Sequence, residues 1–440
     1  MTFLEAEDYL LGLELFGMRF GLDRMHKLMT ALGMPQRRFA QVHVVGSNGK
    51  SSTTRFIAAI LERHGLRTGS YTSPHLSSYR ERIEVGEQAV SEERFAAAVE
   101  RAAQAAAMVD RPLGPDDGVT QFEALTAAAY HELAASRVEV AVIEAGLGGR
   151  YDATNVIPSR VQVLTGVGLE HTRWLGPTVA DIAAEKLAVV RDGGTLVVGD
   201  LEPEVQAAAE RAAADHHAVL VKAPGSGESS SKEGRCSPFD DRGVAKGGRC
   251  PPFDGLPLRA AGGFQRTNFA LAAAAAEAFL GHPLDPAAVR RAAADTAIPG
   301  RLETVDHRPL TLHDGAHNPA GVRALVATLG EVSEGRSPLV LVASVLDDKD
   351  VAGMLEALLP VAAHAVFTRC SNPRALSPGT LESLSAKLGG PPAETVAGPR
   401  AAVARAREIA GPGGAVLATG SIYLIADLVR EDVQSRASTL

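Results

Sequence analysis

Cysteine is scarce in this chain, aromatic residues are few, and basic residues are not in excess. The three cysteines, Cys236, Cys250 and Cys370, make no disulfide framework, and none has the tight spacing of a metal site. The formal charge is 44 − 52 = −8, which argues against a general binder of nucleic acid or of anionic membranes. These absences leave the ordinary globular proteins as the class to consider.

Long apolar runs are also missing, because no stretch is long enough to span a bilayer. The first ten residues carry Glu5, Glu7 and Asp8, unlike the basic and apolar segments of a leader. We therefore expect a cytoplasmic protein with no membrane partner. At 440 residues, with 45% hydrophobic and 22% charged residues, the chain should fold into two domains.

The first part of the chain alternates between strand and helix patterns. Apolar spacing predicts helices within residues 1–33, which Gly33 and Pro35 end. Short apolar runs predict strands over residues 42–45, 138–143, 161–164 and 195–198, and helices over residues 51–64, 122–135 and 181–190. This order predicts an α/β domain with a doubly wound parallel sheet over residues 1–298, carrying a phosphate-binding loop.

Residues 223–255 differ in character, because glycine, serine, proline and charged residues dominate them. The segment from Gly234 to Asp240 returns, with one change, from Gly248 to Asp254. We interpret this stretch as an inserted surface segment whose deletion should leave activity largely unchanged. A metal site on Cys236 and Cys250 is the alternative interpretation.

A break at residues 298–300 precedes a second alternating pattern. Strands are predicted over residues 310–313, 339–343, 365–368 and 415–419, with helices between them. This order predicts a smaller, Rossmann-like α/β domain over residues 299–440.

A glycine loop follows the first predicted strand and precedes a helix. Its residues are Gly46, Ser47, Asn48, Gly49, Lys50, Ser51 and Ser52. The glycines allow the backbone to approach phosphate oxygens, and the amides at the start of the helix point at the same anion. Lys50 can reach the β- and γ-phosphates, and the hydroxyl of either Ser51 or Ser52 can contact Mg²⁺ or a phosphate. The loop predicts an ATP site, with a plain strand-to-helix turn as the alternative.

An ordered set of motifs resembles the folylpolyglutamate synthase/dihydrofolate synthase family of the Mur ligase superfamily. Besides the loop, the set comprises residues 20–25, 72–76, 81–83, 120–123, 144–155, 171, 185–186, 265–268, 299–301, 314–319 and 348–350. Each motif alone is weak, but their order covers nearly the whole chain apart from residues 223–255.

The resemblance implies an ATP-dependent ligase that joins L-glutamate to folate, and also to dihydropteroate, through an acyl phosphate. Negative charge builds up on the transferred phosphoryl group, so cations are needed around it. The resemblance further implies two Mg²⁺ sites and small-molecule partners only, and we expect a monomer.

The resemblance also assigns metal ligands. Glu144 ends a predicted strand and suits Mg²⁺ as a hard oxygen ligand. Ser73 is placed at the first Mg²⁺ and His171 at a second. Lys186 lies near the end of a helix that opens with a capping box at Thr178, and family members often carry a carbamylated lysine there. For each of these residues a purely structural role is the alternative.

The remaining site residues are assigned to the nucleotide or to the other substrates. Asn268, which opens an alanine-rich helix, and Arg301 are placed on ATP. Asp314 and His317 are expected to contact the nucleotide and either the reacting phosphate or the incoming glutamate, and both are counted with Lys50 and Lys186 as catalytic. Phe122 and Glu123 are placed at the pterin, Arg82 and Ser421 at the glutamate carboxylates. Glu123 also completes a capping box with Thr120, which alone would explain both residues.

Two rival functions remain. A peptidoglycan-type Mur ligase has the same loop and chemistry, but we expect a UDP-binding domain before its loop, and only 45 residues precede Gly46. A nucleotide-binding switch without ligase chemistry would not need Glu144, His171 and Lys186 together. Folylpolyglutamate synthase activity without dihydrofolate synthase activity is a third alternative within the same family.

Overall fold

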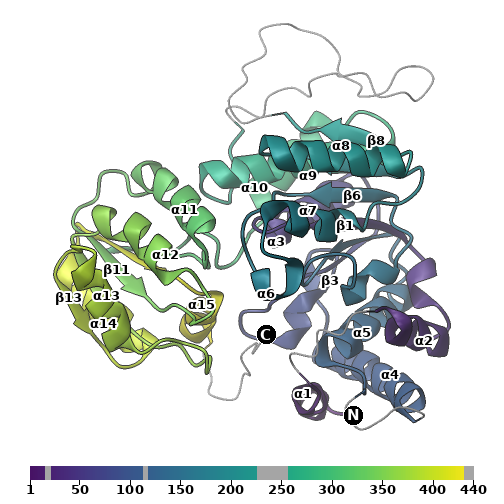
Figure 1. The fold of residues 1–440 in the computed structure, drawn as a ribbon, viewed down its shortest axis with the longest axis horizontal. Coiled ribbons are helices and arrows are strands. Elements are labelled where there is room, and N and C mark those ends of the chain that lie inside the picture. Colours follow the sequence, from purple (N-terminus) through teal and green to yellow (C-terminus); the bar gives the residue numbers. More distant parts are fainter. Residues whose placement is uncertain (15–20, 112–116, 225–255, 431–440) are drawn as a thin grey trace, which may run out of the picture.

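The protein, seen in a computed structural model, forms two α/β lobes, each built on its own sheet (Figure 1). The structure describes residues 1–14, 21–111, 117–224 and 256–430. The segment interpreted as an insertion, with Cys236 and Cys250, lies outside the described residues apart from its first two positions, and so does Phe20 of the first motif.

The first sheet has eight strands in the order β4-β3-β2-β5-β1-β6-β7-β8. They are β1 (Ala40–Val45), β2 (Thr68–Tyr71), β3 (Ile83–Val85), β4 (Gln88–Ala89), β5 (Val140–Glu144), β6 (Val161–Leu164), β7 (Thr195–Val198) and β8 (Val219–Lys222). All neighbours pair in parallel except at β3 and β4, which run antiparallel at one edge. The four strands predicted in this region are confirmed, and β2, β3, β4 and β8 are additional.

Helices cover both faces of this sheet because alternate side chains of its central strands point to opposite sides. In β5, Ala141 and Ile143 pack with α1 (Phe3–Gly12), α2 (Asp23–Ala31), α4 (Glu92–Asp110) and α5 (Gln121–Ala135). Val140 and Val142 pack with α3 (Lys50–Arg63), α9 (Gly263–Leu280) and α10 (Pro286–Asp295). Three further helices, α6 (Thr172–Leu175), α7 (Val179–Leu187) and α8 (Pro203–Asp215), belong to the same lobe. This is the predicted doubly wound arrangement.

The second sheet has six strands in the order β13-β12-β11-β14-β10-β9. They are β9 (Glu303–His307), β10 (Leu310–His313), β11 (Leu339–Ala343), β12 (His364–Phe367), β13 (Ala393–Thr395) and β14 (Ala415–Thr419), and only β9 is antiparallel. Its helices are α11 (Pro319–Val332), α12 (Val351–Leu358), α13 (Pro378–Lys387), α14 (Pro399–Ala410) and α15 (Ile422–Val429). The boundary predicted at residues 298–299 falls between α10 and β9 and stays a prediction.

The carboxyl ends of the parallel strands direct the functional segments to one region, as is usual for open α/β sheets. β1 leads into Gly46, β5 ends at Glu144, and β10 leads into Asp314.

No helix among the described residues is both long and apolar enough to cross a membrane.

Candidate active site

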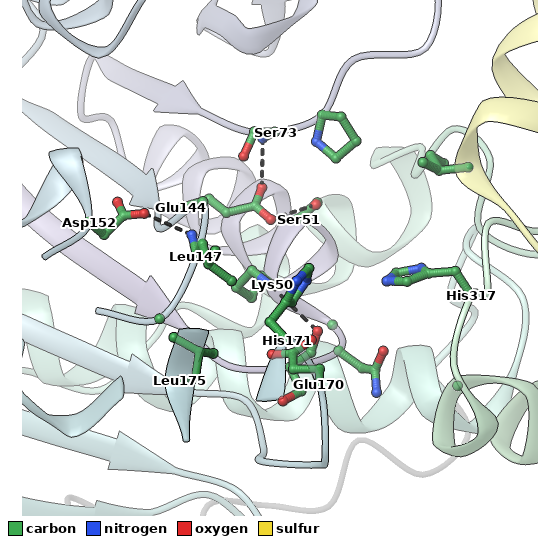
Figure 2. Close-up of a pocket in the computed structure, with 18 of the residues that line it drawn as sticks. Lys50, Ser51, Ser73, Glu144, Leu147, Asp152, Glu170, His171, Leu175 and His317 are labelled. Atoms are coloured by element: carbon green, nitrogen blue, oxygen red, sulfur yellow. Dashed lines mark hydrogen bonds between the residues drawn. The ribbon is translucent and has the colours of Figure 1, made fainter. Parts of the chain in front are cut away.

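A cavity of about 910 Å³ is lined by residues of both lobes. Its walls include every residue predicted for the site except Gly46 and Arg82. Figure 2 shows the cluster around Glu144 and Lys50, with His317 approaching from the second lobe.

The glycine loop is held in place by segments far away in the sequence. Gly49 precedes α3 with a φ of 83°, and a Cβ there would lie 2.4 Å from Oδ1 of Asn268. Glycine is therefore required for both conformation and space. The prediction that Asn268 opens its helix is wrong, because α9 begins at Gly263 and Asn268 lies in the second turn. From there its side chain reaches the loop.

Lys50 folds back over its own loop. Its Nζ donates to the carbonyl of Gly46 at 3.0 Å, and the same carbonyl accepts a hydrogen bond from Nζ of Lys186 at 2.9 Å. The carbonyl of Gly46 therefore binds two lysine ammonium groups, although Gly46 does not itself line the cavity. Such a loop presents positive charge to an anionic ligand.

Glu144 lies at the centre of the first lobe's wall and is 1% exposed. Its Oε1 accepts from the hydroxyl of Ser51 at 2.9 Å, and its Oε2 accepts from the amide of Ser73 at 3.1 Å (Figure 2). Burial raises the pKa of Glu144, an effect that the nearby Lys50 opposes. Between the two hydroxyls left open by the sequence, it is Ser51 that touches this carboxylate, while Ser52 lies buried in the cavity wall.

Lys186 forms an ion pair with Glu170, with Nζ and Oε1 2.7 Å apart, and both side chains are buried. Burial alone would raise the pKa of Glu170, but Lys186 and Lys50 outweigh it and hold that pKa at about 2. The capping box at Thr178 is confirmed and begins the helix that carries Lys186.

His171 follows Glu170, and burial, together with Lys349, lowers its pKa to about 4. The imidazole is thus neutral at pH 7, the form that can bind a metal.

The second lobe contributes Asp314, His317 and Arg301. Asp314 is buried and accepts from the amides of Leu302 and Ala316, at 2.8 and 2.7 Å. Nδ1 of His317 lies 3.0 Å from the carbonyl of Gly315, which fixes Nδ1 as the protonated nitrogen and leaves Nε2 as an acceptor. Burial lowers the pKa of His317 to about 4, so this ring is also neutral at pH 7.

Phe122, Gly146 and Leu147 form an apolar wall of the cavity. A Cβ at Gly146 would lie 2.5 Å from Cζ of Phe122, so the backbone of Gly146 packs directly against the far end of that ring. Glu123 completes the capping box of α5 and pairs with Arg24 at 3.0 Å, and it also lines the cavity, where its contact with the pterin stays a prediction. Asp152 accepts from the amide of Leu147 at 2.8 Å beside this wall (Figure 2).

The structure does not bring Arg82 to the cavity. Its side chain is 1% exposed, stacks over the ring of Tyr79 at 5.3 Å, and donates from Nε to Nδ1 of His75 at 2.9 Å. The cavity wall of the second lobe instead holds Lys349 and Arg374, which both lie against Asp348, at 3.1 and 3.5 Å. The sequence analysis gave no role to Lys349 and Arg374, or to Arg24, Asp152 and Glu170. The motif at residues 348–350 was a signal for Lys349.

Comparison with known proteins agrees with the geometry of the site. Residues 300–422 match the family described as Mur ligase, glutamate ligase domain. The dihydrofolate synthase/folylpolyglutamate synthase of Mycobacterium tuberculosis is 36% identical over 394 residues, which cover 84% of this chain and 78% of that protein.

Two solved structures share the whole fold. The folylpolyglutamate synthase of Mycobacterium tuberculosis complexed with ADP superposes with a TM-score of 0.86, at 32% identity over 99% of each chain. An Escherichia coli protein in complex with DHPP and ADP superposes with a TM-score of 0.81, at 29% identity over 97% of each chain. The chain therefore belongs to the folylpolyglutamate synthase/dihydrofolate synthase family of ATP-dependent ligases.

Proposed function

We propose that this protein uses ATP to join L-glutamate to the carboxylate of a folate and to that of dihydropteroate. The observation that carries the proposal is one cavity shared by both lobes. It combines a phosphate-type loop, a buried carboxylate, an aromatic wall and a set of cations from the second lobe. The relatives with ADP and DHPP support a nucleotide and a pterin in this cavity.

The reaction has two steps. The acceptor carboxylate attacks the γ-phosphorus of ATP, so that ADP leaves and an acyl phosphate forms. The amine of glutamate then attacks the acyl carbon, inorganic phosphate leaves and the amine loses a proton. Lys50 and the amides of its loop stabilise the charge on the transferred phosphoryl group, and Arg301 and Asn268 hold the nucleotide.

The residues around Glu144 fit a magnesium ion. Glu144 is a buried carboxylate that makes no ion pair among the described residues, and the hydroxyl of Ser51 and the Ser73 segment lie against it. Mg²⁺ is held in this way elsewhere, by one or two carboxylates with water and substrate phosphates completing its shell. When bound, the ion would neutralise charge between the β- and γ-phosphates.

No cluster of three His, Cys, Asp or Glu side chains suited to a metal occurs in the described parts of the chain, so a second ion at His171 would depend mainly on substrate oxygens.

Carbamylation of Lys186 is a separate proposal. Burial lowers the pKa of this lysine, and the neutral amine is the form that adds CO₂, releasing one proton. The ion pair with Glu170 opposes carbamylation, because the pair stabilises the ammonium form of Lys186. A carbamate signal in the ¹³C NMR spectrum of protein equilibrated with ¹³CO₂, absent from Lys186→Arg, would support the modification, and an unchanged spectrum would exclude it.

The incoming glutamate is placed against the second lobe. Its carboxylates need cations, and Lys349 and Arg374 line that wall. Lys349 also lies close enough to His317 and His171 to lower the pKa of each. We place the amine near Nε2 of His317, which can accept its hydrogen bond, and Ser421 at one carboxylate. Arg82 belongs to a buried aromatic cluster instead and keeps only a supporting role in this proposal.

Glutamate-dependent ADP release, measured with dihydropteroate, tetrahydrofolate and a UDP-muramoyl peptide in parallel, tests the proposal. Turnover is expected with both pterin acceptors and not with the peptide. Turnover with tetrahydrofolate alone would reduce the function to folylpolyglutamate synthase activity. ADP release with only the UDP-muramoyl peptide as acceptor, or with no acceptor, would overturn the proposed function. The same preparation should sediment as a monomer, and a cytoplasmic location stays a prediction.

A further inference from the structure

His43 is a fully buried histidine on β1 to which the reaction assigns no task. Its neighbours Val42 and Val44 point into the core beneath α3 and α9, so His43 points to the opposite face, towards α5. Nε2 of His43 lies 2.8 Å from Oγ1 of Thr154, while Nδ1 has no hydrogen-bond partner among the described residues. A buried imidazole with one satisfied nitrogen calls for an explanation.

The hydrogen bonds that continue from Thr154 have one direction only. The hydroxyl of Thr154 donates to Oδ1 of Asp152, and the amide of Thr154 donates to the same oxygen at 3.0 Å. Because a hydroxyl carries a single proton, Oγ1 must accept from His43, so Nε2 carries the ring proton. The chain therefore runs from His43 through Thr154 to Asp152. Burial raises the pKa of Asp152, and the backbone amides that donate to its carboxylate oppose this shift.

Asp152 passes this constraint to the aromatic wall. Its Oδ2 accepts from the amide of Leu147 at 2.8 Å, and this bond fixes the turn that follows Glu144 (Figure 2). In that turn Gly146 packs on the ring of Phe122, and Leu147, Asp152 and Phe122 all line the cavity. His43 itself does not line the cavity, so it can act on a ligand only through the others.

We propose that His43 is a positioning residue for the flat ring of the acceptor substrate, acting through Thr154 and Asp152 on the wall formed by Leu147 and Phe122. The inference rests on the proposed function in that the ring is taken to be the pterin of that acceptor. Hydrogen-bond networks of this kind fix a site more firmly than their separate bonds suggest. Removing His43 should loosen the ring subsite and leave the phosphate loop intact.

The test compares His43→Leu, Thr154→Val and His43→Gln, whose side-chain amide can still donate towards Thr154. His43→Leu and Thr154→Val should each raise the KM for the pterin acceptor about tenfold, as for one lost buried hydrogen bond, with the KM for ATP within about twofold of wild type. The KM of the double variant for the pterin acceptor should be no higher than that of the more damaged single variant, because both substitutions break the same series of hydrogen bonds. His43→Gln should recover most of the affinity.

The single tryptophan, Trp174, also lines the cavity, so its fluorescence should report acceptor binding without turnover. Gln162→Leu is the matched control, because Gln162 lies beside His43 in register on β6, is equally buried, and within the described residues its side chain bonds to Ser159 alone. The inference is overturned if acceptor and ATP affinities fall together, if the control gives the same selective loss, or if Gln does not recover binding in a variant that melts like wild type. Failure of the proposed function is distinct, because wild-type protein would then neither bind nor turn over any pterin.

Discussion

The two walls of the cavity are held in place in different ways. In the first lobe the functional side chains are tied to segments far away in the sequence, since Glu144 bonds to Ser51 and Ser73, and Lys186 bonds to Gly46 and Glu170. In the second lobe several of the bonds are local, since Nδ1 of His317 bonds to a carbonyl two residues away and Lys349 pairs with its neighbour Asp348. The first wall is thus preorganised for phosphate, whereas the second presents its groups from a separate body.

A reciprocal amide pair joins the two walls. Nδ2 of Asn318, which caps α11, donates to Oδ1 of Asn48 at 2.9 Å, and Nδ2 of Asn48 lies 3.3 Å from Oδ1 of Asn318. The phosphate loop therefore touches the second lobe directly. The comparison predicts that damage to the first wall stops phosphoryl transfer, and that damage to the second wall weakens glutamate capture.

Lys50→Ala should have the largest effect. It removes the cation of the phosphate loop, and we expect ADP formation to fall by at least about a hundredfold with the fold intact. ADP release in the presence of both substrates is the measurement. Arg63→Ala, on the same helix but paired with Glu87 and Asp295, is the control. Retained turnover in Lys50→Ala would show that this loop is not the phosphate site.

Glu144→Gln should come next, because it keeps the size of the side chain and removes its charge. We expect about a hundredfold loss of activity at low Mg²⁺, with partial recovery as the Mg²⁺ concentration rises. Titration of activity against Mg²⁺ gives the measurement, and Glu139→Gln, just before the same strand, is the control. An unchanged Mg²⁺ dependence would place the ion elsewhere.

His317→Ala should have a smaller and more selective effect. Loss of one hydrogen bond to the incoming amine should raise the KM for glutamate about tenfold and leave that for the acceptor unchanged. Initial rates with each substrate varied in turn make the comparison, and the exposed His307, on β9 of the same lobe, serves as control. Equal losses for all three substrates would contradict the division between the walls.

His43→Gln should have the smallest effect on activity, and its clearest effect should be on the pH dependence of stability. Burial, with a smaller contribution from Arg191, lowers the pKa of His43 from 6.5 to about 3. The unfolded chain therefore takes up a proton that the folded chain refuses, so this stability is present above pH 6.5 and is lost as the pH falls towards 3.

As the pH falls below 6.5, the free energy of unfolding should decrease with a slope that approaches about 1.4 kcal/mol per pH unit, and the slope should be shallower between pH 7 and 6. His43→Gln should remove this contribution to the slope. Denaturant unfolding at pH 7, 6 and 5 measures it, with the exposed His26→Gln as the control. An identical slope in wild type and His43→Gln would show that burial does not lower the pKa of His43 in the folded protein.

The sequence predicted the central parts of both sheets and missed their edges. The β1–loop–α3 unit is contiguous and combines an apolar strand with a glycine loop, so its pattern suffices, whereas β2 has the sequence Thr-Gly-Ser-Tyr and is identified only by its pairing with β5 and β3. Asn268 was placed at a helix start because the alanine run begins after it. The five preceding residues of α9 include Gly263 and Thr267, which carry little helix signal.

The site residues divide in the same way. Those at the ends of predicted strands, such as Glu144 and Asp314, could be found because the ends of parallel strands meet. Arg82 could not be placed, since its burial depends on Tyr79 and His75 folding around it. Asp152 was hidden because its partners Leu147 and Thr154 look like loop residues until the turn closes.

The transfer of oxygen from the acceptor carboxylate to phosphate tests the central claim most directly. With an acceptor carrying ¹⁸O at both oxygens of its reacting carboxylate, an acyl phosphate must leave one labelled oxygen in each phosphate released, detected by mass spectrometry. We predict one ¹⁸O per phosphate for each amide formed, and none with Lys50→Ala. Amide formation with unlabelled phosphate would contradict the account.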